Sequence, residues 1–109
     1  MAGTILLSGN EGLATSTLEF DYFVDRIRTG FASQDEAVAA AVYEPLDEGG
    51  MTFISAADLD QAGYKAFAGA VKRAYEASIP EPSFPRHKDR WLELLGMIER
   101  DSRSGFAPS

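Results

Sequence analysis

Apolar residues recur every three or four positions in three stretches of this chain, and this spacing predicts amphipathic helices. The pattern is clearest over residues 61–76, where lysine and arginine stay off the apolar face. It also predicts a helix over residues 16–30, with Gly30 as its end, and a last helix that begins at Pro85. The apolar positions are, in order, Phe20, Phe23, Val24, Ile27 and Phe31; Tyr64, Phe67, Ala68, Val71, Ala74 and Tyr75; Trp91, Leu94, Leu95 and Ile98.

Capping-box sequences mark where two helices begin, because a Ser hydroxyl and a Glu carboxylate three residues later bond otherwise unpaired amides. Ser16 and Glu19 open the helix over residues 16–30. Ser33 and Glu36 open a further, alanine-rich helix, which we expect to end before Pro45.

Two short apolar runs, residues 4–8 and 51–55, predict strands that are available to pair. Glycines in residues 9–12 predict a turn after the first run. Residues 45–50, rich in glycine and carboxylates, predict an exposed turn, and the prolines within residues 79–85 predict an extended connection.

A chain of 109 residues fits one domain. Residues 102–109 have little to bury and predict a disordered tail, which leaves residues 1–101 as a single globular domain. The pattern as a whole predicts a helix-dominated α+β domain with about four helices and a small two-stranded β element.

Composition narrows the class of protein. The chain has no cysteine, which excludes disulfides and thiolate metal sites and favours a reducing compartment. Its start lacks a secretory signal pattern, and no run approaches the roughly 18 apolar residues that span a bilayer. We therefore expect a cytoplasmic protein with no membrane partner.

Negative charge is concentrated in the middle of the chain. The net charge is -7, yet between Arg28 and Lys65 there is no lysine or arginine. This stretch holds seven carboxylates: Asp35, Glu36, Glu44, Asp47, Glu48, Asp58 and Asp60. A one-signed field of this kind speeds encounters with basic partners and repels phosphate backbones and anionic lipid.

These seven carboxylates, together with Tyr43 and Leu46, form the predicted partner-binding site, and the predicted partner is a basic protein. Tyr43, Leu46 and Met51 would add apolar anchoring if exposed, although each is equally compatible with the core. Nucleic acid is not an expected partner, even at the basic run over residues 86–90, because the net charge opposes binding to phosphates. The sequence leaves the oligomeric state open.

Catalytic and metal-binding patterns are weak. Asp58 and Asp60 match the start of a calcium-binding loop, but Ala62 and Gly69 stand where two ligands are required, so helix capping is the favoured interpretation. His87 is the single histidine, and we expect it on a solvated helix face. The sequence therefore predicts no catalytic residue, no metal ion and no cofactor.

A run through the middle of the chain leads from the second predicted strand into the 61–76 helix. It comprises Met51-Thr52-Phe53-Ile54-Ser55, Asp58-Leu59-Asp60, Tyr64-Lys65-Ala66-Phe67 and Val71-Lys72-Arg73-Ala74-Tyr75. In this run, and in its size and charge, the chain resembles the small, acidic, cysteine-free immunity proteins of bacterial contact-dependent inhibition and polymorphic toxin systems. The resemblance implies a protein that binds a cognate toxin and blocks it. A nuclease toxin suits an acidic inhibitor especially well, because its own surface is basic to hold nucleic acid.

Three functions are thus in competition. The first is an acidic protein-binding module, an immunity protein that neutralises a basic toxin domain. The second is an acidic adaptor or structural subunit without a toxin partner. The third is a small enzyme that uses carboxylates, with His87 as an acid-base group.

Overall fold

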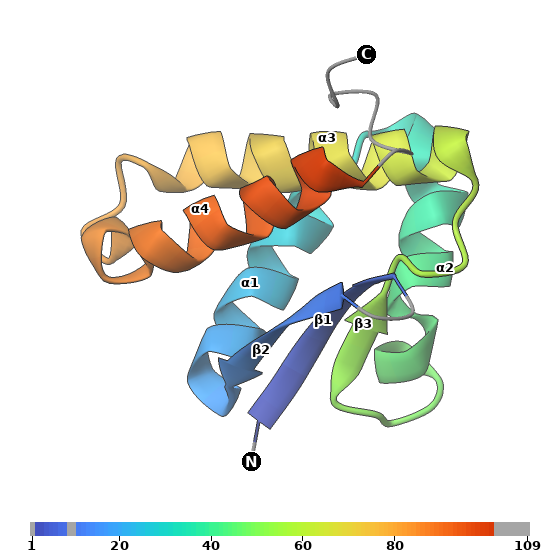
Figure 1. Cartoon of the computed structure of the whole chain (residues 1–109), viewed down its shortest axis with the longest axis horizontal. Helices are drawn as coiled ribbons and strands as arrows, with labels where there is room; N and C mark the ends of the chain where they lie inside the picture. Colours follow the sequence, from blue (N-terminus) through green and yellow to red (C-terminus); the bar gives the residue numbers. More distant parts are fainter. Residues whose placement is uncertain (1, 9–10, 102–109) are drawn as a thin grey trace.

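The computed structural model describes residues 2–8 and 11–101, and within them a three-stranded sheet packs beside four α-helices (Figure 1). The elements are β1 (Ala2–Ser8), β2 (Glu11–Ser16), α1 (Thr17–Gly30), a 3₁₀ turn (Ser33–Asp35), α2 (Glu36–Asp47), β3 (Phe53–Ser55), α3 (Gln61–Ser78) and α4 (Phe84–Arg100). The predicted helix-dominated α+β class is confirmed. The predicted tail, residues 102–109, lies outside the described residues.

The sheet has the strand order β2-β1-β3 and mixes two kinds of pairing. β1 and β2 form an antiparallel hairpin, whereas β1 and β3 run parallel, with Ile5 opposite Ile54. The two predicted strands do pair, but the prediction of a two-stranded element is wrong because β2 is a third strand. With Gly12 in its interior and few β-branched residues, β2 has little strand propensity of its own, so its pairing with β1 forms it.

α1 begins and ends where the sequence predicts. The Ser16 hydroxyl accepts a hydrogen bond from the Glu19 amide, and the Glu19 carboxylate accepts one from the Ser16 amide. The helix ends at Gly30, where α1 crosses α3 so closely that a Cβ would lie 2.2 Å from the carbonyl oxygen of Ala70. Glycine at this position therefore permits the crossing. The predicted core residues of α1 are buried: Phe20, Phe23, Val24 and Ile27.

The predictions for both ends of α2 are wrong. Ser33–Asp35 forms a 3₁₀ turn in place of a capping box, and Asp35 precedes α2 without a side-chain capping bond. The helix continues past Pro45 to Asp47, because a proline in the last turn removes only one backbone donor and its fixed φ suits a helix. Gly50, with a φ of 64°, then turns the chain toward β3.

α3 and α4 run antiparallel and lie side by side (Figure 1). Their connection is a pair of turns, with the Glu81 amide 2.9 Å from the Ser78 oxygen and the Phe84 amide 3.0 Å from the Glu81 oxygen. The predicted extended connection is therefore wrong, since the φ that proline fixes also suits turns. Asp60 caps α3, and Pro85 lies in the first turn of α4, as predicted.

Buried apolar side chains from the sheet and all four described helices form one cluster, which runs in sequence from Ile5 to Ile98. Of the predicted helix faces, Phe31, Tyr75 and Leu95 are half-buried at the edge of this core, and the other members are fully buried. Within the described residues, no helix has the length and hydrophobicity needed to cross a membrane.

Candidate protein-binding surface

The exposed side of α2 carries most of the mid-chain carboxylates. Glu44 is eight residues beyond Glu36, and Asp47 and Glu48 follow three and four residues later, so all four lie on one face of the helix. The exposed residues between them are small: Ala37, Ala40 and Ala41. Because alanine side chains are short, the carboxylates project beyond them into solvent.

A hollow beside α2 adds another carboxylate. It measures about 200 Å³ and lies between α2 and the segment that follows β3. Glu44 lines it from α2 and Asp58 from the opposite side, with Ala41, Pro45, Ser55 and Leu59 as the remaining walls. We call Glu36, Glu44, Asp47, Glu48 and Asp58 the acidic surface.

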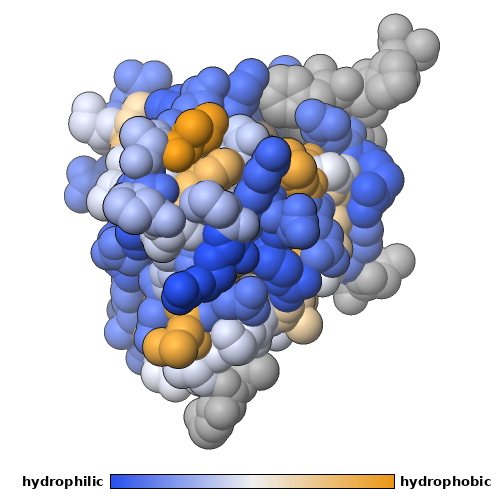
Figure 2. All heavy atoms as spheres, turned by 90° about the vertical axis from the view of Figure 1, so that its left-hand side faces the viewer, coloured by the Kyte–Doolittle hydropathy of each residue, from blue (hydrophilic) through white to orange (hydrophobic). Residues whose placement is uncertain are grey.

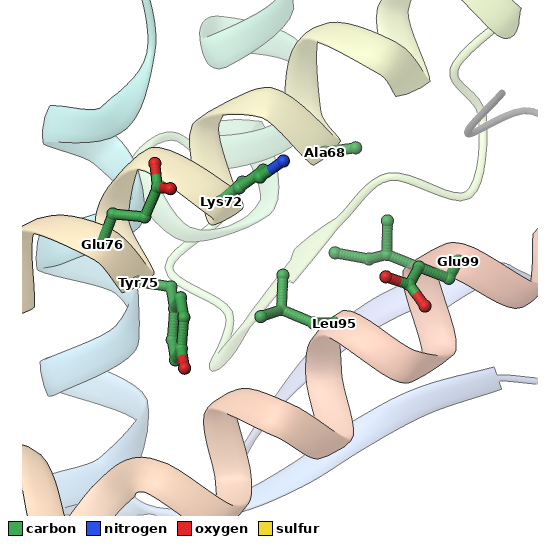
Figure 3. A pocket seen from close by; sticks show the side chains of 7 residues that line it. Ala68, Lys72, Tyr75, Glu76, Leu95 and Glu99 are labelled. Carbon is green, nitrogen blue, oxygen red and sulfur yellow. The ribbon is translucent and has the colours of Figure 1, made fainter. Parts of the chain in front are cut away.

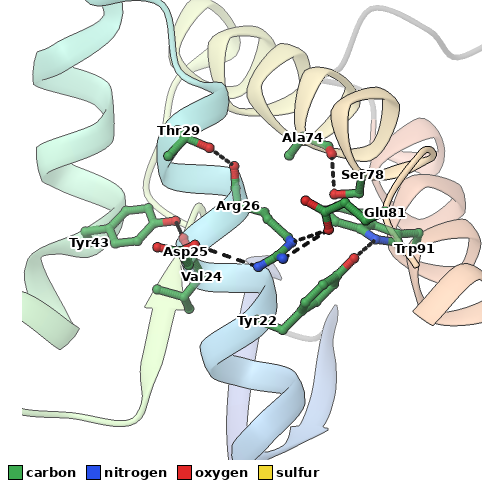
Figure 4. Close-up of polar contacts among 10 residues, drawn as sticks. All are labelled: Tyr22, Val24, Asp25, Arg26, Thr29, Tyr43, Ala74, Ser78, Glu81 and Trp91. Atoms are coloured by element: carbon green, nitrogen blue, oxygen red, sulfur yellow. Dashed lines mark hydrogen bonds and ion pairs between the residues drawn. The ribbon is translucent and has the colours of Figure 1, made fainter. Parts of the chain in front are cut away.

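Arg28 and Tyr43 attach α2 to α1. The Arg28 guanidinium donates to both carboxylate oxygens of Asp47, at 3.0 and 2.8 Å, and lies 4.1 Å from the centre of the Tyr43 ring. The hydrogen bond between them lowers the pKa of Asp47 and raises the pKa of Arg28. The Tyr43 hydroxyl donates to the Val24 carbonyl at 2.6 Å, and burial raises the pKa of this phenol (Figure 4).

The structure separates the other predicted site residues by role. Tyr43 is only 1% exposed, so it belongs to the core and is not an exposed anchor. Leu46 is half-buried against the core, whereas Met51 is 51% exposed in the turn after α2. Asp35 is half-buried before α2, and the exposed Asp60 accepts a capping bond from the backbone at 2.8 Å.

Cations of the C-terminal half do not neutralise the acidic surface. Arg86 and Lys88 are exposed near the start of α4, at the opposite end of the molecule from α2 (Figure 1). Among the ion pairs of the described residues, the one that involves the acidic surface joins Asp47 to Arg28 of α1. Apart from the pair between Arg28 and Asp47, the acidic surface is therefore not neutralised by ion pairs within the described residues.

The molecule's other end, around the α3–α4 connection, presents only isolated hydrophobic side chains on a hydrophilic surface (Figure 2). A broad apolar interface is not present on the face in this view. This end of the molecule therefore offers no apolar alternative to the acidic surface.

The single histidine takes a structural place. His87 stacks on Tyr22 with ring centres 3.8 Å apart, and the Trp91 indole donates to the Tyr22 hydroxyl at 3.1 Å. The Arg26 guanidinium also lies over the Tyr22 ring, 4.1 Å from its centre. It donates a hydrogen bond to the Glu81 carboxylate at 3.0 Å (Figure 4). Burial lowers the pKa of His87. The prediction of a solvated histidine is therefore wrong, because α1 covers its ring.

A groove between α3 and α4 is the feature that sequence reasoning missed (Figure 3). Its volume is about 160 Å³, and Tyr75 and Leu95 line it as side chains that are half-buried. Both residues belong to the predicted apolar helix faces and lie at their edges. Periodicity identifies such edges, but the separation of the two helices decides whether a groove remains open.

These features define a small α+β protein that carries an acidic surface on and beside α2. Among its described residues there is no cluster of three side chains suited to a metal ion. No protein-family model matches the chain. It is 41% identical over 107 residues to the immunity protein CdiI of Burkholderia pseudomallei, and the match covers 98% of each chain.

A solved structure has the same fold. It is the complex of the CdiA-CT toxin from Burkholderia pseudomallei E479 with its cognate CdiI immunity protein, and the match has a TM-score of 0.92 and 40% identity. The match covers 95% of this chain and 100% of that one. The chain therefore belongs to the CdiI immunity protein family, which confirms the resemblance drawn from the sequence. As a member of a family of toxin inhibitors, it is not an enzyme.

Proposed function

We propose that this protein binds a cognate toxin domain of the CdiA-CT kind and neutralises it. The observation that supports this function is the likeness to CdiI along nearly the whole chain, since the solved relative forms a complex with its cognate CdiA-CT toxin. The protein acts as a binding partner and needs no cofactor. We place its action in the cytoplasm, with which its lack of cysteine agrees.

The acidic surface is the proposed contact with the toxin. Five carboxylates stand on and beside α2, and the single ion pair recorded for them among the described residues leaves Glu36, Glu44, Glu48 and Asp58 for a partner. Such a field accelerates association with a basic surface. A nuclease toxin is the partner that suits the acidic surface best, because the surface with which a nuclease binds nucleic acid is basic. Carboxylates bound to that surface would exclude the nucleic acid.

A charge-reversal experiment tests the proposed contact. Glu36→Lys/Glu44→Lys changes two exposed carboxylates of the acidic surface, and the matched control Asp21→Lys/Asp89→Lys changes two exposed carboxylates on α1 and α4, outside that surface. Both proteins carry the same net charge. Association with the proposed cognate toxin domain of the CdiA-CT kind is measured by stopped flow at several salt concentrations, and protection is measured as growth of cells that express the toxin.

We expect the acidic-surface variant to associate at least about tenfold more slowly, with a weaker dependence on salt, while the control stays close to the wild type. Equal rates for the two variants would place the contact elsewhere on the protein. Failure of the wild-type protein to bind the toxin or to protect the cells would overturn the proposed function itself.

A further inference from the structure

The groove between α3 and α4 has an apolar interior and a charged rim. Ala68 and Ile98 form buried parts of its wall, and Tyr75 and Leu95 extend toward each other from the two helices (Figure 3). Charged side chains stand at its edge: Lys72 and Glu76 on α3, and Glu99 on α4. The core residues beside the groove, Ala68 and Ile98, are buried although the groove is open. The groove is therefore available to a partner without any change in the core.

The size of the groove matches one ring. Its volume of about 160 Å³ is close to the roughly 150 Å³ of an apolar cavity that holds a benzene molecule. Unlike such a cavity, the groove opens to the surface, so a side chain can enter from outside. Hot spots of protein interfaces are typically aromatic side chains seated in pockets of this kind.

One member of the acidic surface, Asp58, lies just before the helix that forms one wall of the groove. α3 begins at Gln61, directly after Asp60 and close to Asp58, and Ala68 lies seven residues further along the same helix. At 1.5 Å per residue this is a distance of roughly 10 Å along the helix axis. A standard interface buries about 800 Å² on each partner, which spans far more than that distance.

The rim charges favour a basic partner over a second copy of this chain. Two carboxylates and one ammonium group leave a negative rim, so an aromatic side chain with a lysine or arginine beside it is complementary. Two copies, each with a net charge of -7, repel one another and would bring their own glutamates together.

We infer that the α3–α4 groove is a second contact site for the toxin and receives one aromatic side chain that has a basic neighbour. This inference rests on the proposed function. The acidic surface then sets the rate of encounter, whereas the groove slows dissociation, because an apolar anchor acts only after the two surfaces meet.

Filling the groove from within tests the inference. Ala68→Leu extends a side chain into the groove from α3 while keeping helix propensity, and Ala77→Leu makes the same change at an exposed position of the same helix. Binding of the full-length variants to the proposed cognate toxin domain is measured by surface plasmon resonance. Their melting temperatures are recorded in parallel, and their masses in solution by light scattering.

We expect Ala68→Leu to weaken affinity at least tenfold, mainly through faster dissociation, with a melting temperature no lower than that of Ala77→Leu. If Ala68→Leu does not fold, Leu95→Ala provides the second variant, since it removes one wall of the groove, and we expect it to dissociate about fivefold faster. If the variant that folds dissociates from the toxin at the wild-type rate, the inference is overturned. The proposed function stays intact in that case, because the wild-type protein still binds the toxin. A dimeric wild-type protein that Ala68→Leu makes monomeric would also overturn the inference, because the groove would then hold a second copy.

Discussion

The Tyr43→Phe substitution separates a core role for this residue from a partner-binding role. It removes one hydroxyl and keeps the ring on which Arg28 lies. The lost hydrogen bond to the Val24 carbonyl is short, at 2.6 Å, and buried. The Val24 carbonyl still accepts the backbone bond of α1, so no acceptor is left without a partner. We therefore expect a loss of about 1 kcal/mol in the free energy of unfolding, the central value for one intramolecular hydrogen bond.

Urea unfolding followed by circular dichroism measures this loss. With a slope of about 2 kcal/mol per molar urea, the midpoint should fall by roughly 0.5 M with an unchanged slope. The melting temperature should fall by about 4–8 °C. Tyr75→Phe is the matched control, because the Tyr75 hydroxyl makes no hydrogen bond to the described residues, and its midpoint should stay within about 0.2 M of the wild type.

Toxin binding gives the second measurement on the same variant. Because Tyr43 is 1% exposed, Tyr43→Phe should bind the toxin within about twofold of the wild type. An unchanged urea midpoint together with a tenfold loss of affinity would refute the reasoning, since the hydroxyl would then contact the partner and not α1.

Two further predictions concern the helix contacts that hold the fold. Gly30→Ala should lower the free energy of unfolding by about 3 kcal/mol, because the new Cβ would meet the backbone of Ala70. In the control Gly69→Ala the Cβ meets only the tip of the Arg73 side chain, so this variant should be neutral or more stable than the wild type. Equal urea midpoints for the two variants would contradict this prediction. The lowered pKa of His87 means that the unfolded chain binds its proton more readily, so stability should be complete above pH 6.5 and fall as the pH drops below that value. Urea midpoints between pH 7.5 and 5 should decline less in His87→Gln than in the wild type, and parallel declines would show that the half-buried His87 is not the source of the pH dependence.

The sequence predicts the helices well where apolar spacing and burial agree. In α1, α3 and α4 a wide stripe of large side chains meets the core, so periodicity alone locates the buried residues. The capping residues Ser16 and Asp60 then fix two of the helix starts. These signals are local, and they survive in the folded chain because packing reinforces them.

The errors arise where tertiary contacts decide. β2 depends on its pairing with β1, and α2 passes through Pro45 because the rest of its last turn remains bonded. In the alanine-rich α2, few large apolar residues mark which face of the helix is buried. The sequence therefore does not show that Tyr43 points inward while Glu44 points outward. The pairing of Asp47 with Arg28 and the approach of Asp58 to α2 depend on the fold in the same way.

The arrangement of α2 separates the residues that hold the helix from those proposed to meet a partner. Val42 and Tyr43 are its fully buried residues, and the Arg28–Asp47 pair adds a polar link to α1. Glu36, Glu44 and Glu48 take no part in these contacts, so changing them alters the field around the protein with little effect on folding. A rigid helix also holds its carboxylates in place before binding, which reduces the entropy lost when the partner docks. With the proposed toxin contact on the acidic surface, substitutions on the outer face of α2 would change recognition of the toxin while the core that supports the helix stays the same.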